Sequence, residues 1–163
     1  MMGRPVSSGR IHPRIPGYLG RALSLEFSAV QQYMTQASLV EAWGLPEAAA
    51  RLRREMVEEM HHADRLTQRM LALGFAPAAS QLRPARAGGD LAALLREDLR
   101  LEREIIALYQ DAVTCCRRLG DAGHEDFFAA LLEEEIHGFH GLEQWLASLA
   151  PTRHHDFGDR VYF

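Results

Sequence analysis

The sequence predicts an all-α protein, a four-helix bundle with one long crossover between the second and third helices. Four long segments carry apolar residues at helical spacing, and no stretch alternates as a β-strand would. The middle connection is long and rich in proline and glycine, whereas the other two are short. Short connections join antiparallel helices, so the chain is expected to form two helical hairpins.

The first two helices are expected after an irregular N-terminal arm. Residues 1–16 contain three prolines among glycine and serine and predict that arm. The first helix is expected over residues 18–43 and is followed by Gly44. The second is expected over residues 46–73, because the fixed φ of Pro46 suits a first helical turn.

The third helix is expected to begin near Asp90, a suitable N-cap, and to end near Gly120. The fourth is expected from Gly123–His124 until just before Pro151. The chain therefore divides into the arm (1–16), the bundle (17–150) and a C-terminal tail (151–163). No internal repeat is evident.

The middle connection, residues 75–89, is long enough to run the length of the bundle. Roughly 15 extended residues span on the order of 50 Å, and a helix of about 28 residues is only about 42 Å long. The second hairpin can therefore pack against the first by a single crossover.

Composition excludes several classes of protein. The formal net charge of −4 does not indicate a nucleic-acid partner. No apolar run is long enough to cross a membrane, and the N-terminus lacks the apolar core of a secretory signal. Cys115 and Cys116 are adjacent and are expected to be structural thiols. The expected location is the cytoplasm.

Acidic residues interrupt the apolar face of every predicted helix. A buried glutamate costs several kcal/mol unless it is paired or bound to metal. Two of these glutamates precede a histidine by three residues, so each pair shares a helix face and can bind one ion. The predicted ligands are Glu26, Glu59, His62, Glu102, Glu134 and His137.

This combination is the one found in di-iron and di-manganese four-helix bundles. Two divalent ions would neutralise the four glutamates, and the mixed oxygen and imidazole ligands suit iron or manganese, with zinc able to compete. On the helical projection Glu59 and His62 lie nearer the apolar face than the rival pair Glu58 and His61. The competing interpretation is a plain bundle with solvated acids near its ends.

At these residues the chain resembles the bacterioferritins over most of positions 18–146. The resemblance rests on LEFSAVQQY in the first helix, WGL at its end, EEMHHADR, EDLRLE and LLEEEIHGF. It implies a ferritin-like four-helix bundle whose six predicted ligands match the ferroxidase site, with Glu59 and Glu134 as bridging carboxylates. It also implies oxidation of Fe(II) by dioxygen or peroxide, for iron storage and detoxification in an oligomeric cage.

Three further residues acquire roles from their positions. Tyr33 matches a tyrosine near the di-iron centre, where it would donate an electron or a hydrogen bond; simple packing is the alternative. Asp98 lies one turn before Glu102 and could orient a ligating imidazole, or be a satisfied polar residue. Met60 matches the methionine that ligates haem b at the bacterioferritin dimer interface; packing beside Met56 is the alternative.

The resemblance ends at the C-terminus. Bacterioferritins finish with a short fifth helix that helps to close the cage, whereas residues 151–163 are poor helix formers. A homodimer is therefore expected and the full cage is left open. His154, His155 and Asp156 could bind metal, or the tail could pack on a neighbour.

Two other functions use the same residues. One is a different di-iron or di-manganese oxidoreductase, a peroxidase or an oxidase, that stores no mineral. The other is a haem-binding or interaction protein whose di-metal site is only structural. A rubrerythrin-type protein is disfavoured because no rubredoxin-like cysteine pairs are present, and a DNA-protecting mini-ferritin because the ligand set is complete within one bundle.

Overall fold

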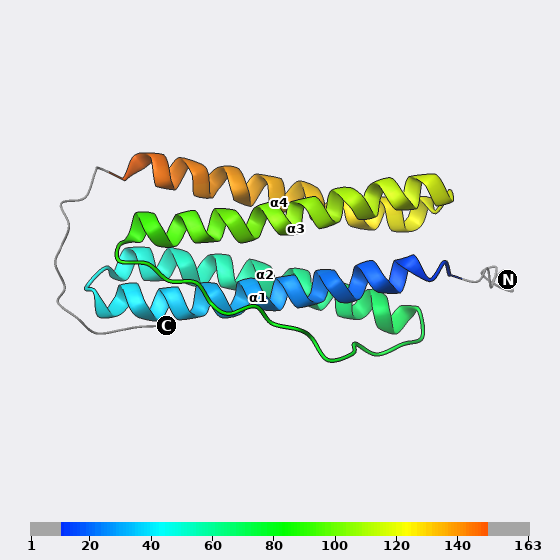
Figure 1. Cartoon of the computed structure of the whole chain (residues 1–163), viewed down its shortest axis with the longest axis horizontal. Coiled ribbons are helices and arrows are strands. Elements are labelled where there is room, and N and C mark those ends of the chain that lie inside the picture. The colour runs from blue at the N-terminus through cyan, green and yellow to red at the C-terminus, as the bar shows by residue number, and fades with distance from the viewer. Residues whose placement is uncertain (1–10, 150–163) are drawn as a thin grey trace, which may run out of the picture.

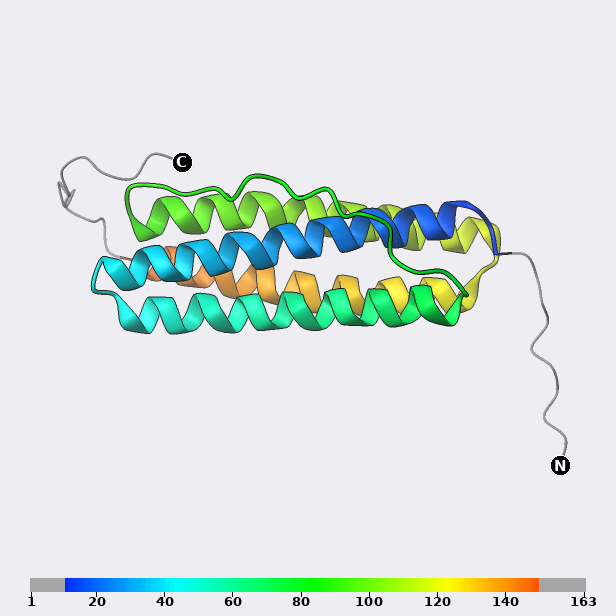
Figure 2. The ribbon, with the colours of Figure 1, turned by 90° about the horizontal axis from the view of Figure 1, so that it is seen from below.

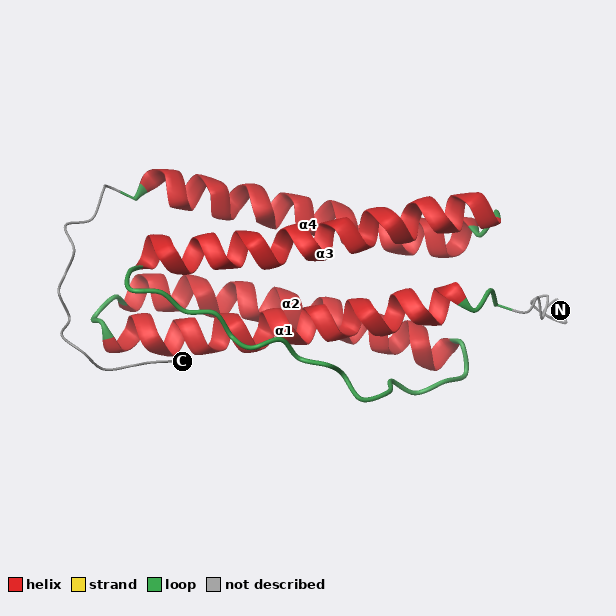
Figure 3. Cartoon of the chain, viewed as in Figure 1, coloured by secondary structure: helices red, strands yellow, loops and turns green. Residues whose placement is uncertain are grey.

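Four antiparallel helices lie side by side in the computed structural model, which describes residues 11–149. They are α1 (Arg14–Ala42), α2 (Pro46–Ala72), α3 (Leu91–Leu119) and α4 (Ala122–Ser148). α1 and α2 form one hairpin, α3 and α4 form the other, and the hairpins meet chiefly through α1 and α3 (Figure 1). No strand occurs in residues 11–149 (Figure 3). The predicted fold class, a four-helix bundle with one long crossover, is confirmed.

Glycines and aspartates set the helix ends. Gly44 and Gly120 follow α1 and α3 with φ values of 77° and 69°, a left-handed conformation that favours glycine. The Asp90 carboxylate accepts the N–H of Ala93 at 2.8 Å and caps α3. Asp121 caps α4 in the same way through the N–H of His124 at 3.1 Å.

α1 begins earlier than the sequence predicts. It starts at Arg14, so Pro16 lies inside its first turn instead of in an irregular arm. The N–H groups of a first turn have no partner within the helix, and a proline there costs no hydrogen bond. Residues 1–10 of the predicted arm and the tail with His154, His155 and Asp156 lie outside the described residues.

The crossover runs along the bundle from the end of α2 to the start of α3 (Figure 2). A row of polar side chains on α1, four residues apart, holds its backbone. Ser24 and Ser28 accept the N–H groups of residues 81 and 83 at 3.1 and 3.0 Å. Gln32 accepts the N–H of Arg86 at 3.1 Å, and Gln36 donates to its carbonyl at 3.0 Å. α1 therefore lies between the crossover and the core.

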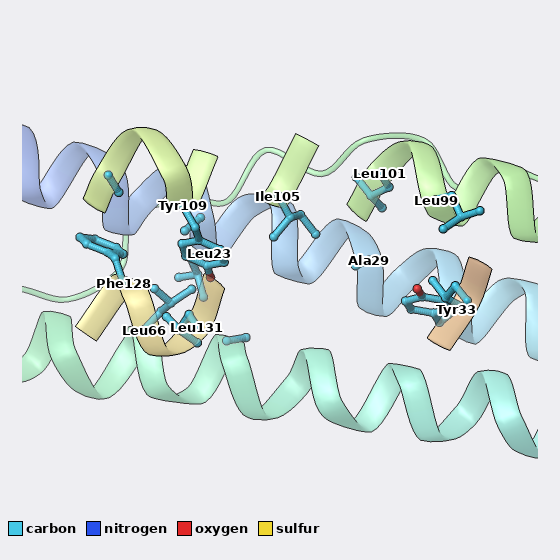
Figure 4. Close-up of a cluster of buried hydrophobic side chains, with 14 of the residues drawn as sticks. Leu23, Ala29, Tyr33, Leu66, Leu99, Leu101, Ile105, Tyr109, Phe128 and Leu131 are labelled. Atoms are coloured by element: carbon cyan, nitrogen blue, oxygen red, sulfur yellow. The ribbon is translucent and has the colours of Figure 1, made fainter. Parts of the chain in front are cut away.

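The core is filled by large side chains from all four helices. Figure 4 shows Tyr33 and Tyr109 toward opposite ends of the drawn cluster, with Ala29 and Ile105 between them. Cys115 and Cys116 are buried free thiols. Within residues 11–149, no helix combines the length and hydropathy that a membrane crossing requires.

Candidate metal centre

Three carboxylates and one imidazole meet in the interior of the bundle. Glu26 comes from α1, Glu59 and His62 from α2, and Glu135 from α4. None of these residues is more than 4% exposed. One ligand atom from each lies within 4.8 Å of all the others, which is close enough to surround an ion.

The imidazole of His62 points one nitrogen at the carboxylates. Its Nδ1 lies 2.7 Å from Glu135 Oε1, 3.2 Å from Glu59 Oε2 and 3.8 Å from Glu26 Oε2. Its Nε2 lies 3.1 Å from Glu134 Oε2, on the outer side. Because an ionised carboxylate only accepts hydrogen bonds, the contact with Glu134 places a proton on Nε2, and Nδ1 faces the cluster.

Glu102 of α3 extends the cluster, and two tyrosines hold the carboxylates of α1 and α3. The Tyr33 hydroxyl donates to Glu102 Oε1 at 2.6 Å. The Tyr109 hydroxyl donates to Glu26 Oε1. Both tyrosines are fully buried, and burial raises the pKa of each hydroxyl well above its ordinary value. They are therefore neutral donors that fix the orientation of the two carboxylates.

Burial and mutual repulsion hold protons on these acids. Burial, then the charge of Glu26, raises the pKa of Glu59 to about 8. Burial, followed by a neighbouring carboxylate, also raises the pKa values of Glu26, Glu102 and Glu135. Burial alone would lower the pKa of His62, but its contacts with Glu135, Glu26 and Glu59 outweigh burial and raise it. A cation bound among these carboxyl groups would therefore be stabilised by them and would allow them to ionise.

The residues present fit a bound metal cation. Glu26 Oε2 is buried and has no hydrogen-bond partner among the described residues, and the buried Glu135 Oε1 lies 2.7 Å from His62 Nδ1. Unpartnered carboxylate oxygens are costly in a protein interior, and a cation removes that cost. Several oxygens with one imidazole nitrogen form a donor set suited to iron, manganese or zinc.

Most of the sequence-predicted ligands lie at this centre. Glu26, Glu59, His62 and Glu102 are all buried there, and the rival pair Glu58 and His61 is exposed.

Three other side chains named from the sequence have different surroundings. Tyr33 touches the centre through Glu102. Asp98 is buried but accepts from the Gln32 amide at 2.7 Å, so it holds α1 and orients no imidazole. Met60 is 48% exposed on α2.

Glu134 and His137 lie elsewhere than the sequence predicts. The Glu134 side chain is 49% exposed and pairs with Arg65 at 2.8 Å, and His137 is exposed. One residue of shift turns a side chain by about 100° around a helix, and this difference carries Glu135 inward and Glu134 to the rim. Burial opposes ionisation of Glu134, but Arg65 outweighs it and lowers the pKa of that carboxyl.

The two hairpins repeat the same chemistry, which the sequence analysis did not detect. A separation of 76 residues relates Glu26 to Glu102 and Glu59 to Glu135. The same separation relates Tyr33 to Tyr109, and each tyrosine donates to the opposite hairpin's carboxylate. Tyr109 and Glu135, both missed as site residues, are therefore found by overlaying the first hairpin on the second.

Comparison with known proteins agrees with this fold. The family model of the ferritin-like domain matches residues 17–150. A bacterioferritin of Brucella melitensis is 34% identical over 146 residues, covering 90% of this chain and 91% of that protein. A bacterial ferritin of Pseudomonas aeruginosa is 34% identical over 143 residues, covering 85% and 90%.

A solved structure is similar over nearly the same span. Rhodobacter capsulatus bacterioferritin superposes with a TM-score of 0.81 at 32% identity, covering 85% of this chain and 87% of that one. That protein was described with a metal-free dinuclear site and a haem iron. The chain therefore belongs to the ferritin-like proteins and, among them, to the bacterioferritin family.

Proposed function

We propose that this protein is a ferroxidase that oxidises Fe(II) to Fe(III) with dioxygen or peroxide, for iron storage and detoxification. The observation that carries the proposal is the buried cluster of Glu26, Glu59, His62 and Glu135, whose ligand atoms all lie within 4.8 Å of one another. The relatives of this protein include bacterioferritins and bacterial ferritins that match 85–90% of the chain.

The proposed ligands take different positions around the ions. Glu59 and Glu135, from facing helices, would bridge them; this assigns to Glu135 the role that the family resemblance gave to Glu134. Glu26 and Glu102 would each bind one ion, and the tyrosine hydrogen bond to one oxygen leaves the other oxygen for metal. Iron bound in this way would give up one electron per ion to the oxidant.

Glu134 is proposed to orient His62 instead of binding metal. Its carboxylate lies 3.1 Å from His62 Nε2, and Arg65 holds it from the other side at 2.8 Å. A histidine ligand whose second nitrogen donates to a carboxylate has a fixed ring orientation and a more basic metal-facing nitrogen. Arg65, Glu134 and His62 thus form a chain from the surface to the metal position.

An acidic groove leads to the centre. A cavity of about 790 Å³ is lined mainly by α2 and α4 and reaches Glu59, His62, Glu102 and Glu135. Exposed Glu58, Glu133 and Glu134 also line it. A groove lined by one sign of charge raises the local concentration of the opposite ion, so Fe(II) would enter by this route.

Aerobic titration of the apo-protein with Fe(II), followed by ferric absorbance, tests the proposal. Absorbance should rise rapidly until two ions per chain are bound, because a di-iron bundle holds two. It should then continue to rise as a soluble ferric product. Replacing Glu59 with glutamine, which keeps the side chain's shape, should remove the rapid phase.

The titration separates the storage function from its rivals. Absorbance that stops at two ions per chain would favour a di-iron or di-manganese oxidoreductase without storage. A Glu59→Gln variant that oxidised iron at the parental rate would contradict the metal centre itself.

Haem b binding at a homodimer interface is a second proposal, and it rests on Met60. This methionine is 48% exposed on α2, and the other exposed large apolar side chains of α1 and α2 include Phe27, Met34 and Val57. A thioether on an exposed apolar surface can reach a haem shared with a second copy of the chain.

Replacement of Met60 by leucine should abolish the haem absorption band of the reconstituted protein and leave Fe(II) oxidation unchanged. Replacement of the buried Met70 by leucine is the matched control and should keep the band. An unchanged haem spectrum in the Met60 variant would contradict this assignment.

A further inference from the structure

The repeat between the hairpins fails at one ligand. His62 follows Glu59 by three residues, and the corresponding position after Glu135 is Gly138. Since the repeated glutamates and tyrosines are identical in the two hairpins, α4 differs in offering no imidazole at the place where α2 supplies one. The two halves of the centre are therefore unequal.

The space left by Gly138 is open. A Cβ atom built on this glycine would meet nothing within 4 Å apart from its chain neighbours and the adjacent backbone of α4. Gly138 also lines the groove of about 790 Å³ that reaches the carboxylate cluster. A side chain at this position would therefore project into free volume and not into packed core.

Neither neighbouring histidine takes the missing place in the structure. His137 is exposed and lies one residue, about 100° of helix rotation, from Gly138. His140 is exposed and its Nδ1 lies 3.1 Å from Glu143 Oε2 on the same helix. The buried Glu135 faces the cluster, and its Oε1 lies 2.7 Å from His62 Nδ1 on the facing helix.

We propose that the second metal position is bound by carboxylate oxygens alone and keeps an open coordination position facing Gly138, available to a small donor from the groove. This rests on the proposed metal centre. The first position has Glu26 and the His62 nitrogen, the second has Glu102, and Glu59 and Glu135 are shared between the two. Water fills the open position, and a neutral nitrogen base of the imidazole class replaces it. The second ion is therefore held more weakly than the first.

Cobalt(II) binding to the apo-protein tests the proposal without any turnover. The visible spectrum and calorimetry should resolve a first ion bound at least about tenfold more tightly than the second, a difference of about 1.4 kcal/mol. Added imidazole should change the spectrum and tighten the binding of the second ion only. In Gly138→His the two affinities should converge and the imidazole effect should disappear.

Two control variants identify the source of each effect. Gly138→Ala adds volume without a ligand and should retain the unequal affinities. His137→Ala should behave as the parent protein does. Two equally tight ions in the parent protein, no response of its second ion to imidazole, or loss of that ion in His137→Ala would each overturn the proposal. Absence of any cobalt at the cluster would instead overturn the metal centre on which it rests.

Discussion

Replacement of Glu135 by glutamine is expected to slow Fe(II) oxidation by about 100-fold or more, because a metal ligand contributes several kcal/mol. Glu135 is 2% exposed and its Oε1 lies 2.7 Å from His62 Nδ1. Glutamine keeps the volume of the side chain but removes its charge and one ligand oxygen. Single-turnover oxidation at a fixed ratio of iron to protein measures the effect.

Glu134→Gln is the matched control on the adjacent residue. Of the two His62 nitrogens, Glu134 contacts only the outer one, Nε2. Loss of a carboxylate that supports a metal-binding histidine in this way costs about 10- to 100-fold in metal affinity or activity. Added iron should restore much of the rate in this variant if affinity is what was lost, but not in Glu135→Gln. The reverse ranking, with Glu134→Gln inactive and Glu135→Gln active, would return the bridging role to Glu134.

The same two variants predict opposite changes in the stability of the apo-protein. Glu135 is held among buried carboxylates that raise its pKa, so its neutralisation should raise the melting temperature at pH 8. Glu134 has a lowered pKa and is stabilised by Arg65, so its neutralisation should lower the melting temperature. A rate loss in Glu135→Gln without loss of stability would exclude misfolding as its cause.

Most of the fold could be predicted from the sequence because residues that favour helix starts or helix ends lie at the boundaries of the helices. Pro46 and Gly120 mark ends that the structure places within a residue or two of the prediction. The exception, the start of α1, arises because a proline is tolerated in a first turn as well as in an irregular arm. The hydrogen bonds between the crossover and α1 could not be predicted, since they depend on which face of α1 the crossover covers.

The metal-centre residues on α2 could be placed from the sequence because Glu59 and His62 share the phase of the apolar face. On α4 the phase was ambiguous, since three consecutive glutamates, residues 133–135, precede a histidine. The Glu-x-x-His spacing favoured Glu134, whereas the buried positions Phe128, Leu131 and Leu142 place residue 135 on the inner face. Apolar periodicity is the stronger signal here because it is set by the packing of the whole helix.

The apo-protein is expected to lose stability as the pH rises from about 5 to 8, by on the order of a few kcal/mol, and to regain it when metal binds. The folded chain holds protons on Glu59, whose pKa is raised to about 8, and on Asp98, whose pKa burial raises to about 7. The unfolded chain releases these protons near the ordinary carboxyl pKa. The folded state therefore binds more protons in this interval, and its free energy of unfolding falls with increasing pH.

His62 contributes in the same direction above its ordinary pKa of 6.5, because its carboxylate contacts raise its pKa in the folded state. The melting temperature of the metal-free protein should fall by roughly 10 °C between pH 5 and pH 8. Glu59→Gln should show a shallower fall, since it removes one of the responsible carboxyls. A melting temperature that was flat or rose over this interval would contradict the buried, proton-holding cluster.

Zinc(II), which has no redox chemistry, should reverse this loss. A ligand at 100 times its dissociation constant stabilises a folded protein by about 2.7 kcal/mol. Binding requires deprotonated carboxylates, so the gain in melting temperature should be larger at pH 8 than at pH 5. As the pH rises, the four buried glutamates ionise and repel one another, which destabilises the metal-free chain. A bound cation removes that repulsion. The interior of this bundle thus gives up stability in the absence of metal, and bound cations restore it.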